Sequence, residues 1–297
     1  MEVVIADAIE EFLVDRRLRN LSEETVAWYS KRLRGALHDL SDRRLSELTS
    51  SEVRSIVADL MDRGRAAGTI NGTLQAVKAL LNWAIEEEIA VGVDPRRLRM
   101  LKQPRMVPQL LTEDQIHALL AAPDLRTFRG RRDRMILLTF LDTGCRVSEL
   151  CGMDVGDVSI PLIRVLGKGR KERLLALSPP VQREMLRYLR IRGTVCPDGG
   201  PLFPSRNGAG RLGRNRVGRI VTAQARRAGI TEVRVTPHLF RRQFASAFLR
   251  GGGPIVHLQQ ILGHADITMS RRYAAIFDAD CFESSMSLSP VAGMRLG

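Results

Sequence analysis

The sequence has few cysteines and no long apolar run. Its 297 residues include four cysteines, at positions 145, 151, 196 and 281, without CxxC spacing. They are too few and too scattered for a disulfide framework or a structural zinc site, so we expect a reducing compartment and no metal. The longest strongly apolar run near the centre, 135–141, is far shorter than the roughly 20 residues that cross a bilayer. This excludes a membrane protein.

The first eleven residues also lack positive charge. They contain four acidic groups and no basic one, the reverse of a secretory signal peptide. We therefore expect a cytoplasmic protein.

Lysine is scarce in a chain that is otherwise strongly basic. Only five of its 46 basic residues are lysine, and two of these, Lys168 and Lys171, lie close together in the second half. Compositional bias alone explains such a shortage. A second explanation is that these positions need a cation that can give up a proton, which a guanidinium essentially cannot do.

The net charge of +13 is unevenly distributed. Residues 1–103 hold 16 basic and 17 acidic side chains, whereas residues 104–297 hold 30 and 16. A cationic excess of this size favours a polyanion such as DNA, because neutralising phosphates releases counterions. A basic solvated surface of an ordinary enzyme is the alternative. In the near-neutral first part, Lys31, Arg32, Arg34 and Lys78 are spaced to form one basic face.

The hydrophobic pattern predicts a mainly α-helical protein of two domains with a small antiparallel sheet. Four amphipathic helices, the last opened by Thr69 and ending near Gly92, predict a helical bundle over residues 1–93. The proline-rich stretch 94–108 is typical of a linker, and residues 109–297 form the second domain. There, β-rich runs on both sides of Gly167 predict a hairpin. This domain is expected to open with a capping box at Thr112 and Gln115 and a short apolar helix. The other expected helices span 132–142, which stops at Gly144, a further turn at 146–150, 181–192, 214–228, 237–250, 254–262 and a segment from 268 onward. Thr236 and Pro237 form the expected start of the helix 237–250, and Gly263 the expected end of the helix 254–262.

Two arginines lie at predicted helix starts with a polar partner nearby. His238 and Arg241 are three residues apart at the beginning of one helix, where side chains share a face and the helix dipole favours an anion. Arg146 follows the glycine turn at Gly144, and Glu149, three residues on, is placed to hold its guanidinium. Ordinary surface residues and a surface ion pair are the alternatives.

His264 and Tyr273 stand nine residues apart near the end of the chain. Tyr29 and Tyr188 occupy apolar helix positions and are predicted to be core residues, whereas Tyr273 follows two arginines. Neighbouring cations favour the phenolate and so make a better nucleophile. A surface tyrosine lying over cations is the alternative.

In series, these motifs resemble the tyrosine recombinase, or phage integrase, family. The sequences TGCRVSEL, GKGRKER, HLFR and LGH, followed nine residues later by a tyrosine, occur in the family's order. The pattern is most similar to the compact Xer-type recombinases. It departs from them at Arg242, where histidine is common, and at Met269-Ser270, where a pair of threonines is common.

The resemblance implies a catalytic role for six residues. Tyr273 would attack the scissile phosphate, Arg146 and Arg241 would bind its oxygens, and Lys168 would protonate the leaving 5′-oxygen. His238 would assist proton transfer, and His264 would donate a hydrogen bond to the phosphate. Glu149 would support the site, and no cofactor or metal would be needed.

The resemblance also implies the partners. These are double-stranded DNA and further subunits, either a homotetramer on DNA or a paired recombinase, with the C-terminal tail docked on a neighbouring subunit. Integration, excision and dimer resolution all remain open. Two other functions stay possible at this point, a type IB topoisomerase-like enzyme and an inactive DNA-binding accessory protein.

Overall fold

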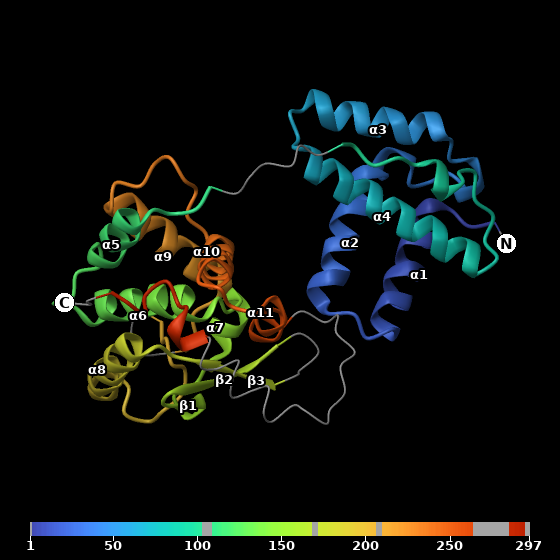
Figure 1. The fold of residues 1–297 in the computed structure, drawn as a ribbon. Helices are drawn as coiled ribbons and strands as arrows, with labels where there is room; N and C mark the ends of the chain where they lie inside the picture. The colour runs from blue at the N-terminus through green and yellow to red at the C-terminus, as the bar shows by residue number, and fades with distance from the viewer. Residues whose placement is uncertain (1, 103–108, 168–171, 206–209, 264–284, 295–297) are drawn as a thin grey trace. The chain divides into compact units, whose positions relative to one another are not determined.

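The chain forms two compact units, each with its own hydrophobic core (Figure 1). The computed structural model describes residues 2–102, 109–167, 172–205, 210–263 and 285–294. The two units are Met1–Val107 and Pro108–Gly297, so the division falls within residues 94–108. Over the described ranges, no helix is both long enough and apolar enough to cross a bilayer.

The first unit is a four-helix structure in which α4 packs against the other three helices. Ser22 caps α2 by accepting the amide of Thr25. Thr69 does not open α4. It lies in the first turn, where its amide donates to the Ala66 carbonyl, and the helix ends at Glu86, before Gly92. The helices are α1 (Ile5–Leu18), α2 (Glu23–Ala36), α3 (Ser50–Asp62) and α4 (Ala67–Glu86), with 3-10 turns at His38–Leu40, Leu45–Glu47 and Pro95–Arg97.

The first part of the predicted linker lies on this unit. Asp94 caps the 3-10 turn Pro95–Arg97, and the Lys78 ammonium donates to the Leu98 carbonyl over 3.1 Å. The side chain of Asn71 binds both the amide and the carbonyl of Leu101. Residues 94–101 are therefore held against α4.

The second unit is built around α6, whose residues 132–143 are all buried. Helices α5, α8, α9 and α10 pack on α6 (Figure 1). The predicted capping box at Thr112 and Gln115 is confirmed at the start of α5. The helices are α5 (Glu113–Ala121), α6 (Phe128–Thr143), α7 (Val147–Gly152), α8 (Pro179–Val195), α9 (Arg214–Arg227), α10 (Pro237–Arg250) and α11 (Ile255–Leu262), with a 3-10 turn at Val155–Asp157.

A small antiparallel sheet lies beside these helices, in the order β1-β2-β3. Strands β2 (Leu162–Leu166) and β3 (Glu172–Ala176) form the predicted hairpin, with Val165 opposite Arg173. The two-residue strand β1 (Val158–Ser159) extends it and was not predicted. The mainly α-helical class with a small sheet is confirmed.

Two helices of this unit end at glycines in the left-handed conformation. Gly144 ends α6 with φ 60°, and Gly263 ends α11 with φ 63°. A Cβ on Gly144 would also lie 2.8 Å from the ring of Phe244, so both conformation and space require glycine there. These two ends meet at the site described next. The helix predicted from residue 268 onward begins outside the described residues.

Candidate active site

Arg146 and Glu149 form a compact unit at the start of α7. The Arg146 amide donates to Glu149 Oε2 over 2.7 Å, and Arg146 Nη1 donates to Oε1 over 2.9 Å. The carboxylate therefore fixes both the backbone and the guanidinium of the arginine, which confirms the predicted contact. The Arg146 side chain is 33% exposed and that of Glu149 is 1% exposed. The carboxylate is thus buried behind a cation that still reaches solvent.

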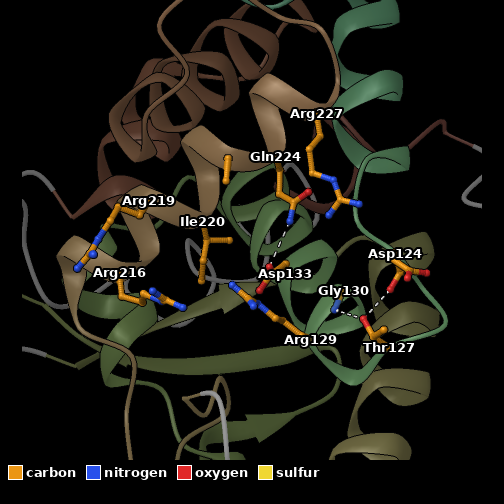
Figure 2. Close-up of a pocket in the computed structure, with 11 residues that line it drawn as sticks. Asp124, Thr127, Arg129, Gly130, Asp133, Arg216, Arg219, Ile220, Gln224 and Arg227 are labelled. Carbon is orange, nitrogen blue, oxygen red and sulfur yellow. Dashed lines mark hydrogen bonds between the residues drawn. The ribbon is translucent and has the colours of Figure 1, made fainter.

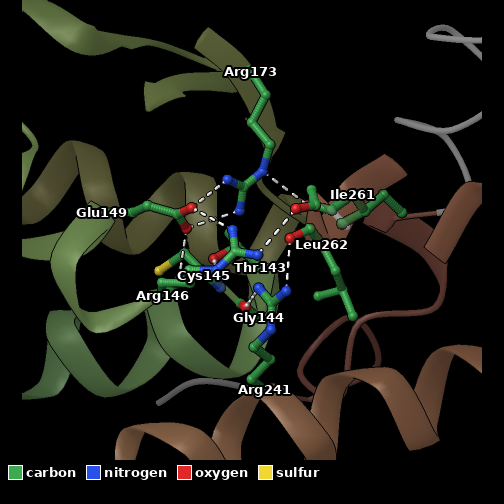
Figure 3. Close-up of polar contacts among 10 residues, drawn as sticks. Thr143, Gly144, Cys145, Arg146, Glu149, Arg173, Arg241, Ile261 and Leu262 are labelled. Carbon is green, nitrogen blue, oxygen red and sulfur yellow. Dashed lines mark hydrogen bonds and ion pairs between the residues drawn. The ribbon is translucent and has the colours of Figure 1, made fainter. Parts of the chain in front are cut away.

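Arg241 approaches the same place from α10 (Figure 3). Its Nη1 donates to the carbonyl of Gly144 over 3.0 Å, and its Nη2 donates to that of Leu262 over 2.6 Å. Arg146 Nη2 donates to the next carbonyl, that of Gly263, over 3.0 Å. Unpaired carbonyls at helix ends need donors, and here the ends of α6 and α11 orient the two arginines.

A third arginine, Arg173 on β3, completes the cluster. It was not predicted from the sequence as a site residue. Its Nη2 donates to Glu149 Oε2 over 2.8 Å, its Nη1 binds Oε1, and its Nε donates to the Ile261 carbonyl over 3.0 Å. The signal was its place in GKGRKER, five residues after Lys168 and on a strand of the predicted hairpin.

The cluster carries excess positive charge. Among the described side chains it contains three guanidinium groups and the single carboxylate of Glu149. Burial lowers the pKa of Arg241 to about 10, as does the nearby charge of Arg146, so the group stays protonated at neutral pH. Burial opposes ionisation of Glu149, but hydrogen bonds from Arg173 and Arg146 hold its pKa below the ordinary value. An anion is the complementary ligand.

His238 lies on the first turn of α10, three residues before Arg241. The helix begins at Pro237 and is capped by Thr236, as predicted, and the imidazole is exposed. Partial desolvation and the charges of Arg242 and Arg241 lower the pKa of His238. The ring is therefore neutral at pH 7 and able to accept a proton.

Three of the six predicted catalytic residues, Lys168, His264 and Tyr273, lie outside the described residues. Of the other three, Arg146 and Arg241 come together around the ends of α6 and α11, and His238 lies one turn before Arg241 on α10.

The other two tyrosines are structural, as predicted. Tyr188 is buried, its hydroxyl donates to the Leu202 carbonyl over 2.7 Å, and burial raises its pKa. Tyr29 packs edge-on against Phe12 in the first core, with ring centres 5.2 Å apart. Both tyrosines therefore contribute to core packing.

A separate hollow of about 440 Å³ opens between α6 and α9 (Figure 2). Four arginines, two from the first half of α9, line it together with the buried side chains of Asp133 and Gln224. Gln224 Nε2 donates to Asp133 over 3.2 Å. The lining arginines are Arg129, Arg216, Arg219 and Arg227.

The basic face expected on the first unit is largely engaged within that unit. Arg34 pairs with Glu10 over 2.6 Å, and Lys78 is bound to the Leu98 carbonyl. Arg32 stacks 4.7 Å from the Trp28 ring and donates to the Thr69 carbonyl. Arg32 and Lys78 are half-buried in these contacts, whereas Lys31 and Arg34 are exposed.

In the part of the chain that is described, no group of three or more His, Cys, Asp or Glu side chains is arranged to bind a metal ion. Cys145, next to Arg146, is fully buried, and burial raises the pKa of its thiol to about 12. It is therefore a packing residue rather than a nucleophile.

Comparison with known proteins identifies the family over both units. Residues 109–280 match the model described as the phage integrase family, and residues 9–88 match the phage integrase N-terminal SAM-like domain. The tyrosine recombinase XerC of Pseudomonas aeruginosa is 31% identical over 274 residues, covering 90% of this chain and 88% of that protein. XerD of Staphylococcus epidermidis is 28% identical over 280 residues, covering 90% and 93%.

Solved structures share the fold at low sequence identity. A lambda integrase fragment, solved as a dimer bound to a core site, aligns with TM-score 0.73 and 18% identity, over 90% of this chain and 97% of that one. The Tn1549 transposon integrase in complex with transposon right end DNA aligns with TM-score 0.71 and 21% identity, over 90% and 93%. From its matches over both units and its curated relatives, the chain belongs to the phage integrase family of tyrosine recombinases.

Proposed function

We propose that this protein is a site-specific recombinase, which cuts and rejoins duplex DNA through a 3′-phosphotyrosyl intermediate and a Holliday junction. The observation that carries the proposal is the cluster of Arg146, Arg173 and Arg241 around one buried carboxylate. A phosphodiester gains negative charge on its non-bridging oxygens as it is attacked, and preorganised cations stabilise that charge.

Arg146 and Arg241 keep N–H groups for the substrate. Their guanidinium groups bind the partners described above through Nη1 and Nη2, and each of these nitrogens carries a second hydrogen. The two guanidinium groups are held by carbonyls and by Glu149, so little reorganisation is needed when the phosphate arrives. We assign them to the non-bridging oxygens.

The remaining roles follow the chemistry of phosphoryl transfer. The Tyr273 hydroxyl oxygen attacks phosphorus, its proton passes to the neutral His238, and the bond from phosphorus to the 5′-oxygen breaks. Lys168 donates a proton to that oxygen, and His264 donates a hydrogen bond to the phosphate. In the second half, a 5′-hydroxyl of the partner duplex attacks the phosphotyrosine and releases the tyrosine. The number of phosphodiester bonds is unchanged, so no cofactor is required.

We further propose that the enzyme works in the cytoplasm as a tetramer on DNA. A lambda integrase tetramer bound to a Holliday junction shares the fold, with TM-score 0.72. The exposed arginines of α9 around the hollow in Figure 2 are suited to phosphate contacts. Their contribution would be largely independent of DNA sequence and sensitive to salt.

Incubation with nicked suicide duplexes tests the function. A covalent adduct is expected with the wild type and with Tyr29→Phe, which keeps the edge-on ring contact, but not with Tyr273→Phe. Strand exchange between two duplexes, with a branched intermediate, is expected to follow. Relaxation of supercoils without a partner site would instead indicate a topoisomerase, and absence of any adduct with a panel of family sites would indicate an accessory protein.

A further inference from the structure

Arg173 joins two elements of the site and has no role in the scheme above. Its side chain is 14% exposed. Both terminal nitrogens bind Glu149, and Nε donates to the Ile261 carbonyl at the end of α11 (Figure 3). The arginine thus connects β3 to α7 and to α11.

The end of α11 explains why a cation is needed at this point. Three successive carbonyls, those of Ile261, Leu262 and Gly263, each accept a hydrogen bond from a different arginine: Arg173, Arg241 and Arg146 respectively. They form the negative end of the helix dipole, where orphan carbonyls need donors. One helix end therefore sets the mutual positions of all three guanidinium groups.

Arg173 also neutralises the buried carboxylate of Glu149. Each carboxylate oxygen of Glu149 accepts one bond from Arg146 and one from Arg173. Without Arg173, the buried carboxylate would be neutralised by Arg146 alone, and that pair would carry no net charge. With Arg173 present, one positive charge remains beside the place of the phosphate.

We propose that Arg173 is a positioning residue for DNA cleavage. It neutralises Glu149 so that the charge of Arg146 stays available to the scissile phosphate, and it fixes the end of α11 that orients Arg146 and Arg241. The inference rests on the proposed function in that Arg146 is taken to bind the phosphate. Arg173 itself acts through Arg146.

The test compares cleavage on two substrates. One is a nicked duplex with an ordinary scissile phosphate, and the other carries a neutral methylphosphonate at that position. On the ordinary phosphate, we expect Arg173→Gln to slow single-turnover cleavage roughly tenfold or more, less than the about hundredfold to thousandfold loss for removing a direct donor. DNA affinity should change little. On the methylphosphonate, which needs less positive charge, the defect should shrink.

A matched control separates positioning from stability. Arg192 is also a buried arginine that binds backbone carbonyls, those of Pro201, Cys196 and Gly199, away from the site. Arg192→Gln should lower thermal stability, but its cleavage rate relative to wild type should be the same on both substrates. An equal defect of Arg173→Gln on both substrates would overturn the proposal.

A double variant tests the charge argument directly. If Arg173 neutralises Glu149, then Glu149→Gln combined with Arg173→Gln should cleave faster than Arg173→Gln alone. A double variant slower than the single one would contradict this part of the proposal. If Arg173→Gln fails to fold, Arg173→Lys, which keeps the charge but not the paired geometry, is measured on the two substrates instead.

The outcomes also distinguish this inference from the proposed function. A wild-type protein that forms no adduct would refute the function. A wild-type protein that forms the adduct, with Arg173→Gln cleaving at the same rate, would refute only the role of Arg173.

Discussion

The second unit contains two groups of arginines that are wholly or partly buried. Arg132 and Arg192 are structural, whereas Arg146, Arg173 and Arg241 form the candidate site. Arg132 is 2% exposed, pairs with the neighbouring carboxylate of Asp133 and donates to the Pro204 carbonyl. Arg192 is equally buried and binds only carbonyls. Both have their donors occupied by fixed partners that seal them from solvent.

The three arginines at the end of α11 differ from these structural arginines in net charge and in exposure to solvent. Arg146 is 33% exposed, and the cluster holds more guanidinium groups than carboxylates among its described members. Burial of arginine alone is therefore poor evidence for function. The indicative features are uncompensated charge, partial access to solvent and orientation by backbone carbonyls at two helix ends.

The largest expected effect comes from removing one of the arginines of the site. Arg241→Ala removes a guanidinium proposed to bind the phosphate, and we expect cleavage to fall about a hundredfold to a thousandfold, the cost of losing one preorganised donor. Single-turnover cleavage of a nicked duplex measures it. Arg250→Ala, on the exposed last turn of the same helix, is the control and should cleave normally.

The second largest expected effect comes from removing a structural arginine. Arg132→Ala leaves the buried carboxylate of Asp133 without its ion-pair partner, which costs about 3–5 kcal/mol of unfolding free energy. Chemical denaturation measures it. Cleavage per folded molecule should remain close to wild type, and a selective loss of cleavage with unchanged stability would contradict the assignment of Arg132 to the scaffold.

A third prediction concerns Asp142, two residues before the glycine that ends α6. Its carboxylate accepts the Ser178 amide over 2.8 Å and the hydroxyl of Ser289 from the C-terminal segment. Burial raises its pKa from the ordinary 3.8 to about 6. The folded protein therefore binds this proton more tightly than the unfolded chain, and the resulting stability is fully present below about pH 3.8 and lost as the pH rises through about 6.

Asp142→Asn should remove this pH dependence. The amide keeps one acceptor for Ser178 and offers a donor to Ser289, so at pH 8 we expect the variant to be more stable than wild type by roughly 2–3 kcal/mol. Thermal unfolding between pH 4 and 8 checks it, with exposed Asp39→Asn as the control. A variant less stable than wild type at pH 8 would refute this account of the buried charge.

The smallest effect concerns proton transfer at His238. Its pKa is lowered by desolvation and by the charges of Arg242 and Arg241, so the neutral, proton-accepting form persists below the ordinary pKa of 6.5. The acid limb of the cleavage profile should lie below that value, and Arg242→Gln should move it to higher pH. A limb that stays in place in Arg242→Gln would argue against His238 as the proton acceptor.

Local signals predicted most of the fold. Thr236 followed by Pro237 marked the start of α10, and the glycines at 144 and 263 marked the ends of α6 and α11. The two-residue strand β1 was missed because it is defined by its pairing with β2 rather than by a pattern of its own.

The site was predicted less completely than the fold. Arg146, Glu149, His238 and Arg241 each stand at a helix start, where sequence reveals the local geometry. Arg173 is defined only by contacts with residues 24 and 88 positions away. Residue spacing cannot predict such a long-range partner. It also cannot predict the three carbonyls that accept hydrogen bonds from the arginines.

Mass spectrometry of the trapped covalent complex tests the central claim most directly. The wild-type protein is allowed to cleave a nicked suicide duplex, and the DNA-linked peptide is isolated and sequenced. We expect one linkage, between the Tyr273 phenol oxygen and a 3′-phosphate, which is lost in Tyr273→Phe and kept in Tyr29→Phe. Linkage through another residue, or to a 5′-phosphate, would contradict the account.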